Sequence, residues 1–236
     1  MFWLFAVFSA YIAQFHREKV LIRFFIKPLP VGLLLVDAIT TDNTLLVWGL
    51  VFSAAGDVLL IPSNGVSAAF GVVSFFTGKI SSCWAVSLNS TFTAHVMYIQ
   101  NFGFNVLDIR LLPRVLLMFA FVIYLLLTIL DKQRNFVTDL WFSISESRDA
   151  KQLLLIKLIV TFYASMLFCM MLSGIDATMT TSHHQPLQAL AGALLFVCSD
   201  LLIATKAVVT IPFHDAVIMM TYYCAQFCIT NWSTQE

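Results

Sequence analysis

The sequence has little charge and lacks the basic cluster that nucleic-acid binding needs. Only 11% of its 236 residues are charged, and the net charge at pH 7 is zero. Because nucleic-acid-binding domains carry a basic patch or stripe, we exclude this class and expect no nucleic-acid partner. No GxSxG motif occurs either, which argues against a conventional serine lipase.

Disulfide and metal-ligand patterns are missing as well. The five cysteines form no CxxC pair, so the sequence indicates neither a disulfide framework nor a zinc ribbon. No HxxxH or HExxH motif occurs in an apolar segment, which argues against an intramembrane zinc hydrolase. The adjacent His183 and His184 could bind a metal, but such a pair in a polar loop more often faces water. We therefore expect no metal ion and no other cofactor.

Apolar residues dominate the composition. They make up 60% of the chain, and the mean hydropathy is +0.88, far outside the usual balance of soluble domains. We predict an all-α polytopic membrane helix bundle with one integral membrane domain over residues 1–236. About eight transmembrane helices are expected, near 2–15, 24–40, 44–61, 66–102, 112–130, 152–175, 187–205 and 212–230. Because a span needs about 20 apolar residues, the fourth segment is too long to be one uninterrupted helix.

The distribution of basic residues predicts the orientation of this bundle. Odd-numbered connections carry eight Lys or Arg residues and even-numbered ones carry two, which favours odd connections in the cytosol. The eight are Arg17, Lys19, Arg23, Lys132, Arg134, Arg148, Lys151 and Lys206, and the two are Arg110 and Arg114. The longest cytosolic connection, 131–151, is either a partner or regulatory surface or a solvated linker.

Three charges lie in apolar sequence, where a membrane disfavours them. They are Lys27, Asp57 and Asp200, and ionisable residues in such positions are candidates for functional sites. The predicted topology puts all three about 5–10 Å inside the same face of the bilayer, so we expect them to meet. The alternative is a purely structural ion pair between helices.

The two carboxylates also share a local pattern. Gly49 precedes Asp57 by eight residues, and Gly192 precedes Asp200 by the same interval. The match favours a four-plus-four internal pseudo-repeat, although chance similarity between apolar segments explains it as well. Two carboxylates in a cavity of low dielectric would let one hold a proton while the other orients or deprotonates water.

Further polar side chains fall on predicted helices. His95 and Tyr98 lie one turn apart on one face, where they could relay a proton or contact a phosphate. Tyr222, Tyr223 and Gln226 carry polar groups into the last helix. Hydrogen bonding between helices, or a histidine satisfied by a neighbouring carbonyl, would explain these residues without any function.

Five short motifs, which run in order from the second predicted span to the eighth, carry a resemblance. They are Lys27-Pro28-Leu29-Pro30; Phe52 with Gly56-Asp57; Phe70-Gly71, Phe75-Phe76 and Ala94-His95 with Tyr98; Gly192-Ala193 with Phe196 and Ser199-Asp200; and Tyr222-Tyr223 with Ala225-Gln226. On these motifs the chain resembles the lysoplasmalogenase family of multi-pass membrane proteins, also called YhhN-like. The sequence departs from the family pattern through a segment, 77–93, that looks inserted within the fourth span and could displace His95.

The resemblance implies an enzyme that hydrolyses the vinyl ether bond of lysoplasmalogens, giving a fatty aldehyde and a glycerophospho-alcohol. On this view Asp57 and Asp200 are the catalytic acid/base pair, in an order left open. Lys27 contacts phosphate or tunes a carboxylate, and His95, Tyr98, Tyr222, Tyr223 and Gln226 line the substrate site. The expected partners are a lysophospholipid substrate and membrane lipids, in the endoplasmic reticulum or another endomembrane.

Two other classes of function stay open at this stage. A membrane transporter or lipid-binding protein would use the same buried charges as an ion or headgroup site. A regulatory scaffold would act through the 131–151 loop, and it predicts that deleting this loop abolishes function while the carboxylates are dispensable.

Overall fold

The computed structural model describes residues 1–16, 20–59, 82–103, 120, 150–180, 187–205 and 212–234. Apart from short turns, this part of the chain is helical and contains no strand. Its helices are α1 (Phe2–Phe15), α2 (Val20–Ile26), α3 (Leu29–Ile39), α4 (Thr44–Leu59), α6 (Ser82–Asn101), α9 (Ala150–Thr180), α10 (Leu187–Thr205) and α11 (His214–Ser233). The predicted all-α class is confirmed.

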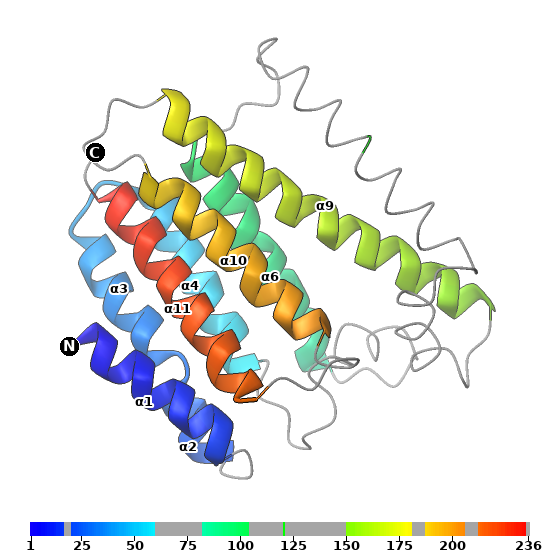
Figure 1. Cartoon of the computed structure of the whole chain (residues 1–236), viewed down its shortest axis with the longest axis horizontal. Coiled ribbons are helices and arrows are strands. Elements are labelled where there is room, and N and C mark those ends of the chain that lie inside the picture. Colours follow the sequence, from blue (N-terminus) through cyan, green and yellow to red (C-terminus); the bar gives the residue numbers. More distant parts are fainter. Residues whose placement is uncertain are drawn as a thin grey trace.

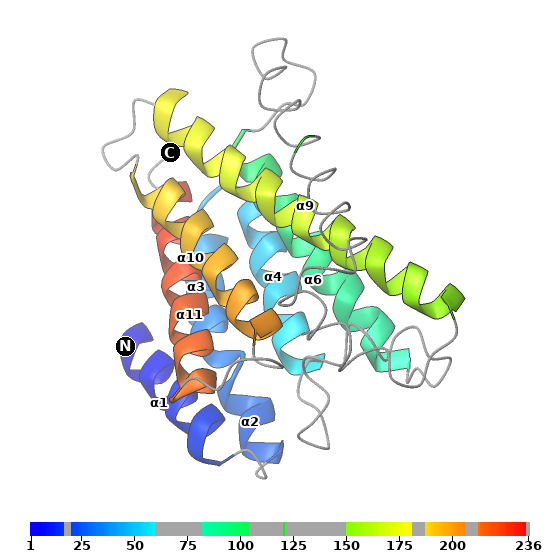
Figure 2. The ribbon, with the colours of Figure 1, turned by 45° about the vertical axis from the view of Figure 1, so that its right-hand side comes forward.

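The helices pack side by side as a bundle (Figure 1). The most extensive contacts join α10 to α11 and α4 to α6, while α9 lies against α10 and α6. On the other side, α1 packs on α11 and α3, as Figure 2 also shows. Helices α6 and α11 thus each adjoin one of the two helices that carry the buried aspartates, α4 and α10.

Several predicted spans agree closely with these helices. The prediction of 187–205 matches α10 to the residue, and 2–15 and 44–61 match α1 and α4 within two residues. The fifth span, 112–130, lies outside the described residues except for residue 120, as do residues 131–149 of the predicted cytosolic loop. No described helix combines the length and apolarity that a membrane crossing requires. The number of spans stays a prediction.

The second predicted span, 24–40, is wrong as a single helix. The helix is interrupted at Lys27 and Pro28, between α2 and α3. Proline has no amide hydrogen to donate, so Pro28 and Pro30 each remove a helical hydrogen bond to the preceding turn. Helical bonding resumes when the Gly32 amide donates to the Pro28 carbonyl at 2.8 Å. The break leaves the Lys27 carbonyl available to another helix.

Helix α6 contains most of the segment that looks inserted. It runs without interruption from Ser82 to Asn101, so residues 82–93 form the first part of the helix that carries His95. Residues 77–81 lie outside the described residues. Despite the presence of this segment, His95 is fully buried between the helices, and it is not displaced from them.

An asparagine network ties three helix ends together, away from the three charges. The Asn43 side chain caps α4 by accepting a hydrogen bond from the Leu46 amide at 3.1 Å, which satisfies a free donor of the first turn. It also donates to Asn101 Oδ1 at 2.7 Å, and Asn101 donates to Ser233 Oγ at 2.5 Å. The start of α4 and the ends of α6 and α11 are thereby held in register.

Glycine sets the closest approach of α10 and α11. A Cβ atom on Gly192 would lie 2.7 Å from Ile229 Cγ1, 3.2 Å from the Ile229 amide nitrogen and 3.3 Å from the Ala225 carbonyl oxygen. Because two of these atoms belong to the backbone of α11, a rotamer change alone would not relieve the contact. The spacing of α10 and α11 thus depends on glycine at this position.

We expect Gly192→Ala to lower the free energy of unfolding by about 1–3 kcal/mol, the usual cost of overpacking. The matched control is Gly32→Ala in α3, where nothing lies within 4 Å of the new Cβ. The control should be neutral or stabilising by about 0.5–1 kcal/mol, because alanine favours a helix over glycine. Thermal melting in detergent measures both variants, and equal midpoints for the two would contradict the close packing of α10 on α11.

Candidate active site

One cavity brings together the three charges that the sequence singled out. Lys27 at the helix break, Asp57 on α4 and Asp200 on α10 all line it, and its volume is about 80 Å³. The remaining lining residues are Ser53, Gly56, Ala94, Phe196, Ser199, Ile203, Ile218, Met219 and Tyr222. The expected convergence of the two carboxylates and the amine is therefore present in the fold.

Asp57 is held through both of its carboxylate oxygens. Lys27 Nζ lies 3.4 Å from Oδ1, and the Tyr222 hydroxyl donates to Oδ2 at 3.0 Å. The Asp57 side chain is 7% exposed and that of Lys27 is 15% exposed. Removing one partner of such a buried pair leaves an uncompensated charge, which is strongly destabilising. The ammonium group therefore balances the Asp57 carboxylate within the bundle.

Asp200 has a different set of partners, and both contact the same oxygen. The Tyr163 hydroxyl of α9 donates to Oδ2 at 2.9 Å, and His95 Nε2 of α6 lies 3.4 Å from that oxygen. The imidazole packs edge-on against Phe196 and Tyr163, with ring centroids 4.8 and 5.7 Å apart. Asp57 and Asp200 thus share a cavity, but each carboxylate has its own basic side chain and its own tyrosine.

Behind the cavity, a closed ring of hydrogen bonds links α4, α6 and α11. The Tyr98 hydroxyl donates to Gln226 Oε1 at 2.7 Å, and Gln226 Nε2 donates to Ser53 Oγ at 3.1 Å. Ser53 completes the ring with a 3.0 Å contact to the Tyr98 hydroxyl. Tyr98 and Gln226 are fully buried and do not line the cavity, so they support its wall from behind.

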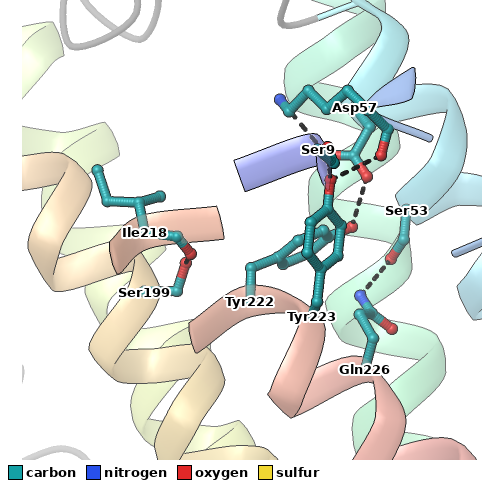
Figure 3. A network of polar contacts seen from close by, with 9 residues as sticks. Ser9, Ser53, Asp57, Ser199, Ile218, Tyr222, Tyr223 and Gln226 are labelled. Carbon is teal, nitrogen blue, oxygen red and sulfur yellow. Dashed lines mark hydrogen bonds and ion pairs between the residues drawn. The ribbon is translucent and has the colours of Figure 1, made fainter. Parts of the chain in front are cut away.

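Tyr223 satisfies the backbone at the helix break. Its hydroxyl donates to the Lys27 carbonyl at 2.8 Å and contacts Ser9 Oγ of α1 at 2.6 Å. In Figure 3, Tyr222, Tyr223 and Gln226 project from one stretch of α11 toward Asp57, Ser9 and Ser53. Helix α11 therefore positions the Lys27 segment and Asp57 at the same time.

The structure separates the predicted site residues into two groups. Lys27, Asp57, Asp200 and Tyr222 line the cavity, whereas His95, Tyr98, Tyr223 and Gln226 lie behind it. The second group was expected to bind substrate. In the described geometry these four side chains are fully buried and contact other protein groups instead. Hydrogen-bonding capacity can be predicted from residue type, but the direction of each side chain depends on helix rotation.

Tyr163 is a site residue that the sequence reasoning did not identify. It lies within the apolar run LLLIKLIVTFYASMLF of α9, and its hydroxyl binds Asp200. A buried tyrosine needs a hydrogen-bond partner for its hydroxyl. Its position within an apolar run therefore indicated that it could bind a polar group of another helix. The missing information was which helix α9 would contact.

The cavity suits water and the reacting end of a larger molecule. Ligand pockets usually have about 300–1,000 Å³, and a water occupies about 30 Å³ in the liquid. A cavity of about 80 Å³ therefore holds a few water molecules beside the carboxylates. Among the residues that the structure describes, no group of three or more His, Cys, Asp or Glu side chains could bind a metal ion.

These features define an all-α protein with a small cavity that two carboxylates and an amine line, and with an imidazole behind its wall. Residues 22–232 match the model of the YhhN family, so the chain belongs to this family. The resemblance seen in the sequence motifs is thereby confirmed. No curated protein and no solved structure matches the chain.

Gln226→Leu is expected to destabilise the protein by about 1–3 kcal/mol, because it leaves the buried Tyr98 and Ser53 hydroxyls without their amide partner. The matched control is Gln100→Leu on α6, where the side chain is exposed, and its stability should change by less than about 0.5 kcal/mol. Thermal melting of the purified proteins measures the stability of both variants. A loss as large in the control as in Gln226→Leu would argue against the ring.

Proposed function

We propose that this chain is a membrane enzyme that hydrolyses the vinyl ether bond of lysoplasmalogens. The substrates would be 1-alkenyl glycerophosphocholine or glycerophosphoethanolamine, and the products a fatty aldehyde and a glycerophospho-alcohol. The observation that carries the proposal is the cavity where Asp57 and Asp200 meet with Lys27. Family membership is compatible with this reaction.

The chemistry of vinyl ethers requires an acid and a carboxylate. Hydrolysis begins with slow protonation of the alkene carbon, which gives an oxocarbenium ion that water captures as a hemiacetal. A carboxylic acid supplies the proton, and a second carboxylate stabilises the cation and activates the water, as in glycosidases. The cavity provides two carboxylates from different helices and space for water. The reaction requires neither a metal ion nor a nucleotide.

The side chains that line the cavity are suited to binding the alkenyl end of the substrate. Phe196, Ile203, Ile218 and Met219 give its wall an apolar character, which suits an alkenyl chain. The cavity is too small to enclose a phosphorylated headgroup as well, so this part of the lipid would remain outside it. Lys27 is engaged with Asp57, which favours charge balance as its role in the reaction over direct phosphate binding.

The apolar composition and the exposed apolar side chains support a membrane location. Large apolar side chains point outward from the first helices: Leu4 is 72% exposed, Phe25 68% and Val36 63%. The charged groups of the cavity point inward instead. Exposed apolar surface on this scale is typical of contact with lipid or with another protein. Lysophospholipids would then reach the cavity from the surrounding bilayer.

One observation favours a second candidate, a transporter of ions or lipid headgroups. The helix break at Lys27 and Pro28 leaves a backbone carbonyl beside a charged cavity. Transporters use interrupted helices of this kind to build binding sites near charged groups. In such a protein the two carboxylates would bind a cargo or a coupling ion and would catalyse no bond cleavage.

The test is aldehyde release from a 1-alkenyl lysophospholipid by the purified protein in detergent. We expect the wild type to release aldehyde, and Asp57→Asn and Asp200→Asn each to lower kcat by about 10²–10⁴-fold, the usual contribution of an acid or base. The saturated 1-alkyl ether lipid is the control substrate, because it has no alkene to protonate and should give no product. Full activity in either variant would show that the site is wrongly assigned, and no release by the wild type would favour the transporter.

A further inference from the structure

The two carboxylates differ in which of their oxygens are occupied. Both oxygens of Asp57 have a partner, Lys27 at Oδ1 and Tyr222 at Oδ2. Asp200 receives Tyr163 and His95 on Oδ2 alone. Within the part of the chain that the structure describes, its Oδ1 accepts no hydrogen bond, and Asp200 lines the cavity. One oxygen of Asp200 is thus free for a molecule in the cavity.

The basic side chains beside the two carboxylates also differ in chemistry. Lys27 Nζ lies 3.4 Å from Asp57 Oδ1, and the two side chains form an ion pair. Asp200 lies next to the His95 imidazole at the same distance. An imidazole nitrogen can donate or accept a hydrogen bond, whereas an ammonium only donates, so His95 can contact the Asp200 carboxyl group with or without a proton on that group.

Tyr163 contacts both the Asp200 carboxylate and the His95 imidazole. Its hydroxyl holds Oδ2 of Asp200 at 2.9 Å, and its ring packs against the ring of His95. Phe196 contacts the imidazole from another side. Tyr163 therefore restrains both the carboxylate and the imidazole, and it directs Asp200 toward the cavity through the oxygen that it leaves free.

From this geometry we infer that Asp200 is the proton donor of the reaction, that Tyr163 is its positioning residue, and that Asp57 is the carboxylate that receives the proton of the attacking water. The inference rests on the proposed hydrolysis and assigns roles within that site. A matching arrangement occurs in carboxylate-pair hydrolases, where one carboxylic acid donates and the other stays ionised.

Each carboxylate takes part twice in the proposed reaction. Asp200 Oδ1 transfers a proton to the alkene carbon that does not bear oxygen, and the resulting Asp200 carboxylate keeps its bonds to Tyr163 and His95. Water adds to the oxocarbenium carbon and gives one proton to Asp57. The product of this step is a hemiacetal. The hemiacetal then loses its hydroxyl proton to Asp200, the bond to the glycerol oxygen breaks, and that oxygen takes the proton from Asp57. Aldehyde and alcohol result, and both carboxylates return to their starting states.

Azide rescue distinguishes the roles of the two carboxylates. Azide is an anionic nucleophile that needs no base, and it would trap the oxocarbenium ion as an α-azido ether. We expect sodium azide to restore substrate consumption in Asp57→Asn by at least tenfold, with the azido ether detected by mass spectrometry. It should restore nothing in Asp200→Asn, because protonation precedes the trapped ion. Rescue of Asp200→Asn, or failure to rescue Asp57→Asn, overturns the assignment.

An unpaired Lys27 could unfold the Asp57→Asn variant. The double variant Lys27→Met with Asp57→Asn removes both charges of this buried pair, which is much less costly than leaving one of them alone. The same azide rescue is then expected in the double variant. Absence of the azido ether from this folded protein would count against Asp57 as the base.

Tyr163→Phe tests the positioning residue. We expect kcat to fall about tenfold with KM unchanged within twofold, because the hydrogen bond that orients Asp200 is lost while the cavity keeps its shape. Tyr11→Phe on α1 is the matched control, since Tyr11 is 49% exposed and should keep wild-type kcat. An unchanged kcat in Tyr163→Phe, or a rise of KM alone, overturns the role of Tyr163. A wild type that releases no aldehyde overturns the hydrolysis itself, which the same assay reveals before any variant is compared.

Discussion

The pairing of Lys27 with Asp57 is the constraint on which the site depends. Removing either partner of a buried ion pair costs about 3–5 kcal/mol, because the other charge stays behind without compensation. The two residues belong to segments thirty positions apart, and their contact at 3.4 Å fixes the broken α2–α3 segment against α4. The same ion pair therefore stabilises the fold and balances the charge of the Asp57 carboxylate at the cavity.

Helices α6 and α11 each supply a partner to one of the two carboxylates. The Tyr222 hydroxyl of α11 binds Asp57 of α4, and the His95 imidazole of α6 lies beside Asp200 of α10. Between them, Tyr98 and Gln226 join α6 directly to α11. A crossed arrangement of this kind would follow from a duplicated four-helix unit, and the equal spacing of Gly49 from Asp57 and of Gly192 from Asp200 agrees with it. The pseudo-repeat stays a prediction.

The interrupted helix at Lys27 serves the site in two ways. Pro28 and Pro30 end the regular hydrogen bonding of α2 and release the Lys27 carbonyl, which accepts a bond from Tyr223. The same break places the Lys27 side chain at the cavity and not along a continuous helix. Because Tyr223 and Tyr222 are adjacent on α11, one turn of this helix stabilises both the backbone of the break and the carboxylate that its lysine binds.

The all-α class, several helix boundaries, the family and the convergence of Lys27, Asp57 and Asp200 could all be predicted from the sequence. Long apolar runs favour helices. Burying an ionised side chain inside such a run costs enough free energy that a partner of opposite charge is expected. The sequence did not reveal Tyr163, the break between α2 and α3, or the placement of His95 and Tyr98 behind the cavity wall. These features depend on which helices become neighbours and how each is rotated about its axis. Packing between distant segments decides both, so only the tertiary structure could show that each carboxylate has a separate basic side chain and a separate tyrosine.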